Sequence, residues 1–283
     1  MTSRPAPSLK NILNSPSYRL AEDDLDFLGR KELRPVRLQL ELLKPEMAFI
    51  EQGILSTIVV FGGTQIVEQH EAEQRLAADQ EALADDPDSA DRQRAVARSE
   101  RIVAKVKYYD AAREFAQIVS AANQQKTLRE YVIVTGGGPG VMEAANRGAF
   151  DVGAKSIGLN ITLPHEQAPN PYITPSLCFQ FHYFALRKMH FLMRAKALVV
   201  FPGGFGTMDE LFDALTLRQT GKLQKIPIIL FGRKYWQSVI NFQFLADEGV
   251  VSDADLNLLH YAETAREAWD SIVRFHQAES SGV

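Results

Sequence analysis

A carboxylate follows a glycine-rich turn at the start of a predicted helix, an arrangement suited to phosphate-ester chemistry. Residues Pro202 to Glu210 read Pro-Gly-Gly-Phe-Gly-Thr-Met-Asp-Glu and follow the apolar run Ala197 to Phe201, so the pattern predicts a strand, a turn and a helix. Glycines let the backbone approach an anion closely, and the N–H groups of the first helical turn point toward it. We therefore expect a phosphate ester here, with the sugar of a bound nucleotide beside Glu210.

The same spacing has a second interpretation. Thr207-x-x-Glu210 is also the pattern of a capping box, in which the two side chains accept hydrogen bonds from backbone amides of the first turn. Spacing alone leaves both interpretations open. If Glu210 contacts a ligand, its position at a helix N-terminus favours the ionised carboxylate, so we expect a base or an electrostatic stabiliser rather than a general acid.

A second glycine turn, Gly136 to Gly140, follows the predicted strand 131–135. It is not the dinucleotide fingerprint, because Val141 stands where the last glycine is needed, and the next predicted strand ends without an acidic residue. The sequence also lacks the G-x-x-x-x-G-K-[ST] run of an ATPase. Two strand-glycine-helix units place two phosphate-type loops at one edge of a parallel sheet, where open α/β folds bind ligands. Purely structural turns are the alternative.

The helix predicted before the Pro202 turn carries basic side chains on one face. Arg187, His190 and Arg194 stand at i, i+3 and i+7, which indicates either a solvated basic stripe or an arginine that points into the cleft. An arginine there would clamp phosphate or stabilise a leaving base.

His165, His182 and His190 lack metal-site spacing, and the sequence has no G-x-S-x-G nucleophile turn.

Alternating strands and helices predict an α/β fold, a Rossmann-like open parallel sheet flanked by helices. We expect an N-terminal helical extension over 1–53, a nucleotide-binding catalytic domain over 54–277 and a disordered tail over 278–283. Within the domain, 65–107 is rich in charge and predicts an inserted arm of two exposed helices joined by a turn. The segment 162–179, rich in Pro and Asn, is expected to be irregular. The predicted strands are 54–61, 131–135, 156–161, 197–201 and 226–231, and the predicted helices of the domain core include 109–122, 141–148, 182–195 and 208–219.

Composition narrows the class of partner. The 283 residues carry a net charge of −4, which argues against general binding to nucleic acid or to an anionic membrane and favours a small ligand. Cys178 is the sole cysteine, so the sequence has neither a disulfide framework nor a CxxC pair, and we expect Cys178 to be a small buried residue. No run approaches the ~18 apolar residues of a membrane span, and no secretory leader is evident, so we expect a cytoplasmic protein.

These motifs resemble those of the Lonely Guy (LOG) family. Pro202 to Glu210 matches its P-G-G-x-G-T-x-x-E signature, and Arg187-Lys188 matches the Arg-Lys pair of the preceding helix. The resemblance covers roughly 54–231 apart from the arm, and also includes Gly136 to Glu143, Leu163-Pro164-His165-Glu166-Gln167 and Asn170-Pro171. Related sequences were often labelled lysine decarboxylases, but that label predicts a pyridoxal-phosphate lysine that nothing in this sequence supports.

The resemblance implies an N-glycosidase, a phosphoribohydrolase that cleaves a nucleoside 5′-monophosphate into free base and ribose 5-phosphate. The implied substrate is AMP or an N6-modified relative such as a cytokinin riboside monophosphate, and neither a metal nor an organic cofactor is needed. Arg187 and Glu210 correspond to the catalytic pair of the family. The implied substrate-binding residues are Gly203, Gly204, Gly206 and Thr207 in the phosphate cradle, Gly136, Gly137, Gly138 and Glu143 in the nucleotide-binding loop, and Lys188.

The long N-terminal segment and the arm resemble those of longer bacterial members, which favours nucleotide salvage over hormone synthesis. The resemblance also implies a homo-oligomer, a dimer or larger, with the cleft near a subunit interface. The alternative is a nucleotide sensor or carrier that binds through the same glycine loops without hydrolysis, with Glu210 acting only as a cap.

Overall fold

The computed structural model describes residues 8–124, 127–163 and 168–280. The chain divides into two compact units, Met1–Lys44 and Pro45–Val283. The predicted domain boundary at residue 53 stays a prediction. The motif positions 164–167, His165 among them, and residues 281–283 of the predicted tail lie outside the described residues.

The N-terminal unit consists of short helices and the first part of a longer one. The guanidinium of Arg37 donates to the carbonyls of Leu28 at 2.6 Å and Arg30 at 2.7 Å, which ties the long helix to the turn before it. The elements are α1 (Leu9–Leu13), η1 (Pro16–Tyr18), α2 (Leu25–Leu28), η2 (Lys31–Leu33) and α3 (Arg34–Glu51), whose last turns belong to the second unit.

The second unit contains a seven-stranded sheet with the strand order β4-β3-β2-β1-β5-β6-β7, in which every neighbouring pair is parallel. The predicted α/β open sheet is confirmed. The strands are β1 (Thr57–Phe61), β2 (Val132–Thr135), β3 (Ser156–Ile161), β4 (Cys178–Phe181), β5 (Ala195–Val200), β6 (Ile228–Phe231) and β7 (Leu259–Ala262). They are apolar and mostly buried, as strands covered on both faces must be.

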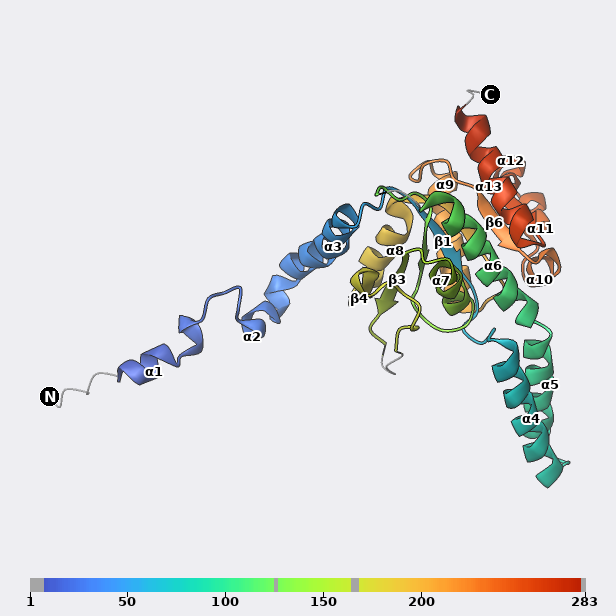
Figure 1. Ribbon diagram of the computed structural model, residues 1–283, viewed down its shortest axis with the longest axis horizontal. Coiled ribbons are helices and arrows are strands. Elements are labelled where there is room, and N and C mark those ends of the chain that lie inside the picture. The colour runs from blue at the N-terminus through green and yellow to red at the C-terminus, as the bar shows by residue number, and fades with distance from the viewer. Residues whose placement is uncertain (1–7, 125–126, 164–167, 281–283) are drawn as a thin grey trace. The chain divides into compact units, whose positions relative to one another are not determined.

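Helices cover both faces of this sheet (Figure 1). One face packs against α6 (Val106–Asn123), α7 (Val141–Asp151) and α13 (Ala265–Ser280), in a core that includes Ile58 and Phe115. Side chains alternate along a strand, so Phe61 points to the other face of the sheet. There the centre of its ring lies 4.8 Å from the centre of the Phe191 ring, in α8 (Phe184–Met193). The remaining elements are η3 (Pro175–Leu177), α9 (Phe205–Gln219), α10 (Arg233–Val239), α11 (Phe242–Asp247) and α12 (Asp253–Leu256).

The strand order reverses between β1 and β5, and this places the ligand-binding edge. Successive strands run from β1 through β2 and β3 to β4 on one side and from β5 through β6 to β7 on the other. Open α/β sheets bind ligands at such a switch point, outside the carboxyl ends of the strands. Two backbone bonds join the loops there: Gly63 N–H donates to the Pro202 carbonyl and Phe201 N–H to the Phe61 carbonyl, each at 2.8 Å.

The charged arm forms a helical hairpin that projects from the sheet (Figure 1). Its helices are α4 (Gln69–Asp85) and α5 (Ala90–Val103), joined by the turn that contains Pro87. The hydroxyl of Ser89 accepts from the Arg92 amide and caps α5, and the Ser99 hydroxyl donates to Asp79 across the hairpin. No helix among the described residues is both long and apolar enough to span a bilayer.

Candidate active site

A cavity of about 420 Å³ opens at the carboxyl edge of the sheet, where the loops after β1, β2 and β5 meet. The side chains and backbone around it come from both glycine turns, the end of β3 and the first turns of α8 and α9. Its described lining residues are Phe61, Gly62, Thr64, Gly136, Gly138, Met142, Asn160, Ile161, Leu163, Phe184, Arg187, Gly204, Phe205, Gly206, Thr207, Asp209 and Glu210.

The turn after β5 holds open space for a ligand. A Cβ added to Gly204 or Gly206 would meet no atom within 4 Å, and both residues line the cavity. At Gly203, by contrast, a Cβ would lie 2.1 Å from the Thr207 hydroxyl oxygen, so Gly203 allows Thr207 to fold over the turn. The Tyr235 hydroxyl donates to the Gly203 carbonyl at 2.6 Å and holds the turn from α10.

The turn after β2 needs its glycines for two reasons. Gly137 and Gly140 have φ angles of 76° and 72°, in the left-handed region that favours glycine. A Cβ on Gly136 would lie 2.6 Å from the Nη2 of Arg187, and one on Gly140 would lie 2.4 Å from the Gly63 carbonyl oxygen. The turn is therefore shaped both by its own backbone and by the close approach of Arg187.

A buried amide network holds the Gly136–Gly138 backbone in place. Asn170 Nδ2 donates to the Gly138 carbonyl at 3.0 Å and to Asn146 Oδ1 at 2.9 Å. The Thr135 hydroxyl also donates to Asn146 Oδ1, at 2.7 Å, and Asn146 Nδ2 donates to the Ser156 hydroxyl at 3.0 Å. Both asparagines are buried. Asn170, which belongs to the family motifs, thus has a structural role at the Gly136 turn. The sequence did not predict a role for Asn146, because its hydrogen-bond partners are distant along the chain.

Arg187 reaches the cavity from α8. Its Nε donates to the Leu159 carbonyl at 2.8 Å, and its guanidinium lies 5.2 Å from the centre of the Phe191 ring. Burial lowers the pKa of Arg187, and the nearby carboxylates of Glu210 and Asp209 act in the opposite direction. The side chain remains a cation at any physiological pH, with nitrogen atoms directed toward the Gly136 turn.

The basic stripe predicted on α8 is not a solvated face. His190 is buried, with its Nδ1 3.5 Å from Glu46 Oε1, and Arg194 forms an ion pair with the same carboxylate. Of the three residues in the stripe, Arg187 lines the cavity, while His190 and Arg194 pack toward the last turns of α3. The second interpretation of the stripe is the one that the structure supports.

Glu210 lies in the second turn of α9 and is 9% exposed. Burial raises its pKa to about 7, against the opposing effect of the Lys188 and Arg187 charges. The expectation that a helix N-terminus keeps this carboxyl ionised is therefore wrong, because α9 starts earlier than predicted and desolvation dominates. Near neutral pH, Glu210 exists in both protonation states and can accept or donate a proton.

The capping-box interpretation is also wrong. Helix α9 starts at Phe205 with Gly204 as its N-cap, and no side chain caps it. Thr207 and Glu210 are therefore the third and sixth helical residues, too far along for the reciprocal cap, which needs them at the N-cap and N3 positions.

Four predicted substrate-binding residues are not among the described residues that line the cavity: Gly137, Glu143, Lys188 and Gly203. The two glycines shape the turns. Lys188 Nζ lies 2.9 Å from Asp209 Oδ1 and links α8 to α9. Glu143 accepts a hydrogen bond from the Tyr109 hydroxyl at 3.0 Å. Direct contact of Glu143 and Lys188 with substrate stays a prediction.

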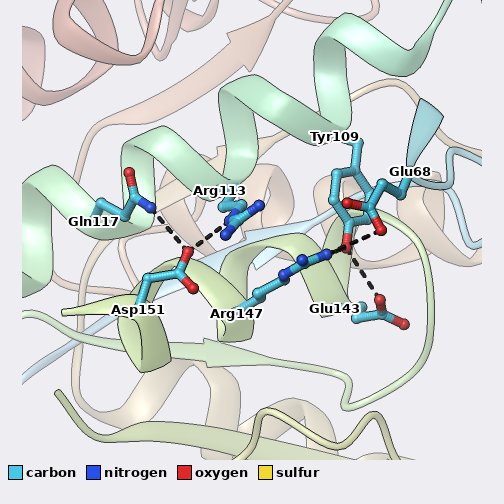
Figure 2. A network of polar contacts seen from close by, with 7 residues as sticks. All are labelled: Glu68, Tyr109, Arg113, Gln117, Glu143, Arg147 and Asp151. Atoms are coloured by element: carbon cyan, nitrogen blue, oxygen red, sulfur yellow. Dashed lines mark hydrogen bonds and ion pairs between the residues drawn. The ribbon is translucent and has the colours of Figure 1, made fainter. Parts of the chain in front are cut away.

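Figure 2 shows the polar network that contains Glu143. Arg147 of α7 lies 3.1 Å from Glu68 Oε2 and 3.4 Å from the Tyr109 hydroxyl. At the last residue of α7, Asp151 Oδ2 accepts from Arg113 at 2.6 Å and from Gln117 at 2.9 Å, both in the middle of α6. The network therefore joins α6 to the first and last turns of α7, and it attaches Glu68, the residue before α4, to them.

Several lining residues were missed in the sequence. Asn160 lies at the end of β3, where its Nδ2 donates to the Phe179 carbonyl at 3.3 Å, and its amide packs against Gly137. Phe184 and Phe205 begin the two helices that flank the cavity. Phe205 fills the variable position of the glycine signature, so the motif drew no attention to it. Among the described residues, no cluster of His, Cys, Asp and Glu is arranged to hold a metal ion.

Comparison with known proteins identifies relatives of this chain. Residues 142–272 match a protein family described as "Possible lysine decarboxylase". The chain is 27% identical over 191 residues to the probable cytokinin riboside 5′-monophosphate phosphoribohydrolase LOGL3 of Oryza sativa subsp. japonica, covering 63% of this chain and 83% of that protein. It is 34% identical over 161 residues to the pyrimidine/purine nucleotide 5′-monophosphate nucleosidase of Escherichia coli K12, covering 50% of this chain and 34% of that protein. The resemblance to the LOG family is thus confirmed.

A solved structure, that of the molybdenum cofactor carrier protein MCP from Chlamydomonas reinhardtii, is also similar. It is 18% identical with a TM-score of 0.44, and the match covers 80% of this chain and 98% of that chain.

Proposed function

Because the chain is related to the LOG phosphoribohydrolases and to the nucleotide nucleosidases, we propose that it hydrolyses the N-glycosidic bond of a nucleoside 5′-monophosphate. The products are a free base and ribose 5-phosphate, and AMP or an N6-modified AMP is the expected substrate. One observation carries the proposal: Arg187 and the buried Glu210 line the same cavity as glycines of both turns. This is the arrangement that a substrate with a phosphate at one end and a glycosidic bond at the other requires.

The phosphate binds at the turn after β5 and the N-terminus of α9. The open space at Gly204 and Gly206 leaves room for it, and the unpaired amides of the first helical turn supply donors. The positive end of the helix dipole adds to the attraction. Arg187 contributes a permanent positive charge to the same cavity and contacts either the phosphate or the departing base.

Glu210 acts at the sugar. Cleavage of an N-glycosidic bond passes through an oxocarbenium-like sugar, which a nearby carboxylate stabilises. In its ionised form, Glu210 accepts a proton from water as the water oxygen bonds to C1′ and the bond from C1′ to the base nitrogen breaks. The protonated carboxyl then returns that proton to the base. A pKa of about 7 suits a group that gains and loses a proton in one cycle.

The test is to incubate the full-length protein with AMP and a panel of other nucleoside 5′-monophosphates, and to follow base and ribose 5-phosphate by chromatography. We expect the wild type to release both products in equal amounts and Glu210→Gln to release neither at a comparable rate. Release by both proteins would exclude the assigned role of Glu210. Nucleotide binding without release from any nucleotide would leave the non-hydrolysing sensor or carrier.

We further propose that the protein is a cytoplasmic homo-oligomer. The family resemblance supports the assembly, and a sequence with Cys178 as its sole cysteine supports a reducing compartment. Multi-angle light scattering of the full-length protein tests the assembly: a mass near 31.6 kDa at every concentration would show a monomer. Cell fractionation with an antibody tests the compartment.

A further inference from the structure

Two exposed aromatic rings stand at the cavity, whose apolar lining also includes Phe61, Met142, Ile161 and Leu163. Phe205, the first residue of α9, is 92% exposed, and Phe184, the first residue of α8, is 50% exposed. Both line the cavity. A phenylalanine gains free energy when its ring leaves water, about 25 cal/mol for each Å² of apolar surface. Rings held in solvent at a binding cavity are therefore available to cover an apolar part of a ligand.

An ion pair fixes the relative position of the two rings. Lys188 of α8 and Asp209 of α9 lie 2.9 Å apart. Phe184 comes four residues before Lys188, and Phe205 comes four residues before Asp209. Residues at i and i+4 share a helix face, and both helices begin at the carboxyl edge of the parallel sheet. The two rings therefore lie one helical turn from the ion pair, toward the N-termini of α8 and α9. Each ring belongs to the first residue of its helix.

The polar groups of the cavity suit the phosphate and the sugar of a nucleotide, whereas the two rings suit neither. The open glycines of the β5 turn accept an anion, and Arg187 and Glu210 are the charged lining residues assigned to phosphate and sugar. Asp209, the third charged lining residue, is paired with Lys188. A nucleotide has one further part, a flat base whose faces are apolar. Bases stack on aromatic side chains with little regard to sequence, because every base has a π-face.

We propose that Phe184 and Phe205 form the base subsite of this cavity and that the heterocyclic base of the substrate stacks on their rings. This inference rests on the proposed function only in taking the ligand to be a nucleoside monophosphate. Stacking favours the larger purine surface over a pyrimidine. Because Phe205 is 92% exposed, the subsite is open to solvent on the side of its ring.

The experiment compares ligands with and without a base. Calorimetric titrations use full-length Glu210→Gln as the background, so that AMP is not consumed, with Phe184→Ala, Phe205→Ala and Phe205→Tyr added singly. We expect each alanine variant to weaken AMP binding about 5- to 150-fold, the range that corresponds to loss of one base-aromatic stack. Binding of ribose 5-phosphate should change less than about twofold, and Phe205→Tyr should retain AMP affinity because it keeps the ring.

Phe244→Ala is the matched control. Phe244 is also exposed, at 54%, and lies in α11, so its loss should affect neither ligand. Equal weakening of AMP and ribose 5-phosphate by the alanine variants would overturn the proposal, because it would show a general distortion of the cavity. Unchanged AMP binding would overturn it as well. Selective loss of AMP binding in a protein whose wild type releases no base would support the subsite and reject the hydrolase. Failure of the background protein to bind either ligand would reject both.

Discussion

The Glu210 carboxyl has its pKa raised from 4.5 to about 7 by burial, and this shift predicts how activity depends on pH. The proposed base is the ionised form, so kcat/KM for AMP should fall as pH drops through about 7. The phosphate of AMP itself titrates near pH 6. AMP binding by Glu210→Gln over the same pH range therefore serves as the control for the substrate. A wild-type profile that stays level between pH 5.5 and 8.5 would contradict the role of Glu210.

The same shift predicts the stability of Glu210→Gln. A carboxyl whose pKa is raised in the folded state costs nothing below its unfolded pKa and destabilises the fold increasingly as pH rises through the folded pKa. Glutamine is neutral throughout. The variant should therefore be more stable than the wild type at pH 8, by an amount on the order of 3 kcal/mol, and nearly equal to it at pH 4.5. Urea unfolding at the two pH values measures the difference, and an equal gain at both would contradict burial as its cause.

Substitution of Gly136 tests whether catalysis depends on the position of the Arg187 guanidinium. A Cβ at Gly136 would lie 2.6 Å from Arg187 Nη2 and 2.9 Å from Met142 Sδ, so Gly136→Ala must displace the guanidinium or the thioether. A shift of about 1 Å in a catalytic group can cost a hundredfold in rate, and we expect a loss of about 10- to 100-fold in kcat/KM. The measurements are kcat/KM for AMP and the melting temperature of the variant, which shows whether the fold has been destabilised. Full activity of Gly136→Ala would contradict the prediction, because it would show that the active site tolerates the added methyl group.

At the scale of elements, the amide network determines the shape of the nucleotide loop. Asn146→Ala removes the acceptor for Thr135 and Asn170 and the donor to Ser156, and leaves those buried groups without this partner. Unsatisfied buried polar groups cost about 1–3 kcal/mol each. We expect the free energy of unfolding to fall by about 3 kcal/mol, as measured by urea titration. Asn257→Ala, at an exposed position, is the control and should change it by less than about 0.5 kcal/mol. A similar result for both variants would show that the network is dispensable.

The elements also show where local patterns succeed. Strand β3 spans the predicted 156–161, and the arm consists of two helices joined by a turn, as predicted, with Pro87 in that turn. Strand β4 (Cys178–Phe181) was missed, because its first half lies in the segment 162–179, whose prolines and asparagines favour loops. Its four residues become a strand by pairing with β3, which is a tertiary effect that no local window contains. Strand β7 was missed for the same reason: it is four residues long and pairs with β6.

For the whole molecule, ligand binding should be visible as thermal stabilisation. A ligand that binds only the folded state stabilises it by about 2.7 kcal/mol at a concentration one hundred times its Kd. For a chain of this size, that corresponds to a rise of about 5–10 °C in melting temperature. We expect this shift for AMP with Glu210→Gln and a smaller one for ribose 5-phosphate, which lacks the base. Adenosine, which lacks the phosphate, is the control. No shift with AMP at millimolar concentration would contradict a nucleotide site.

The sequence by itself determined the parallel α/β class and the two glycine turns. These follow from residues that are neighbours along the chain, since strand, turn and helix signals act over a few positions. The candidate pair Arg187 and Glu210 came from the resemblance to the LOG family, because local spacing left the roles of both residues open. The tertiary structure decided the protonation of Glu210, because desolvation depends on every element packed around the carboxyl. It also decided that Arg187 enters the cavity while His190 does not, and that the Phe184 and Phe205 rings lie at one site. Those properties depend on atoms brought together from distant segments by the fold, so no spacing in the sequence expresses them.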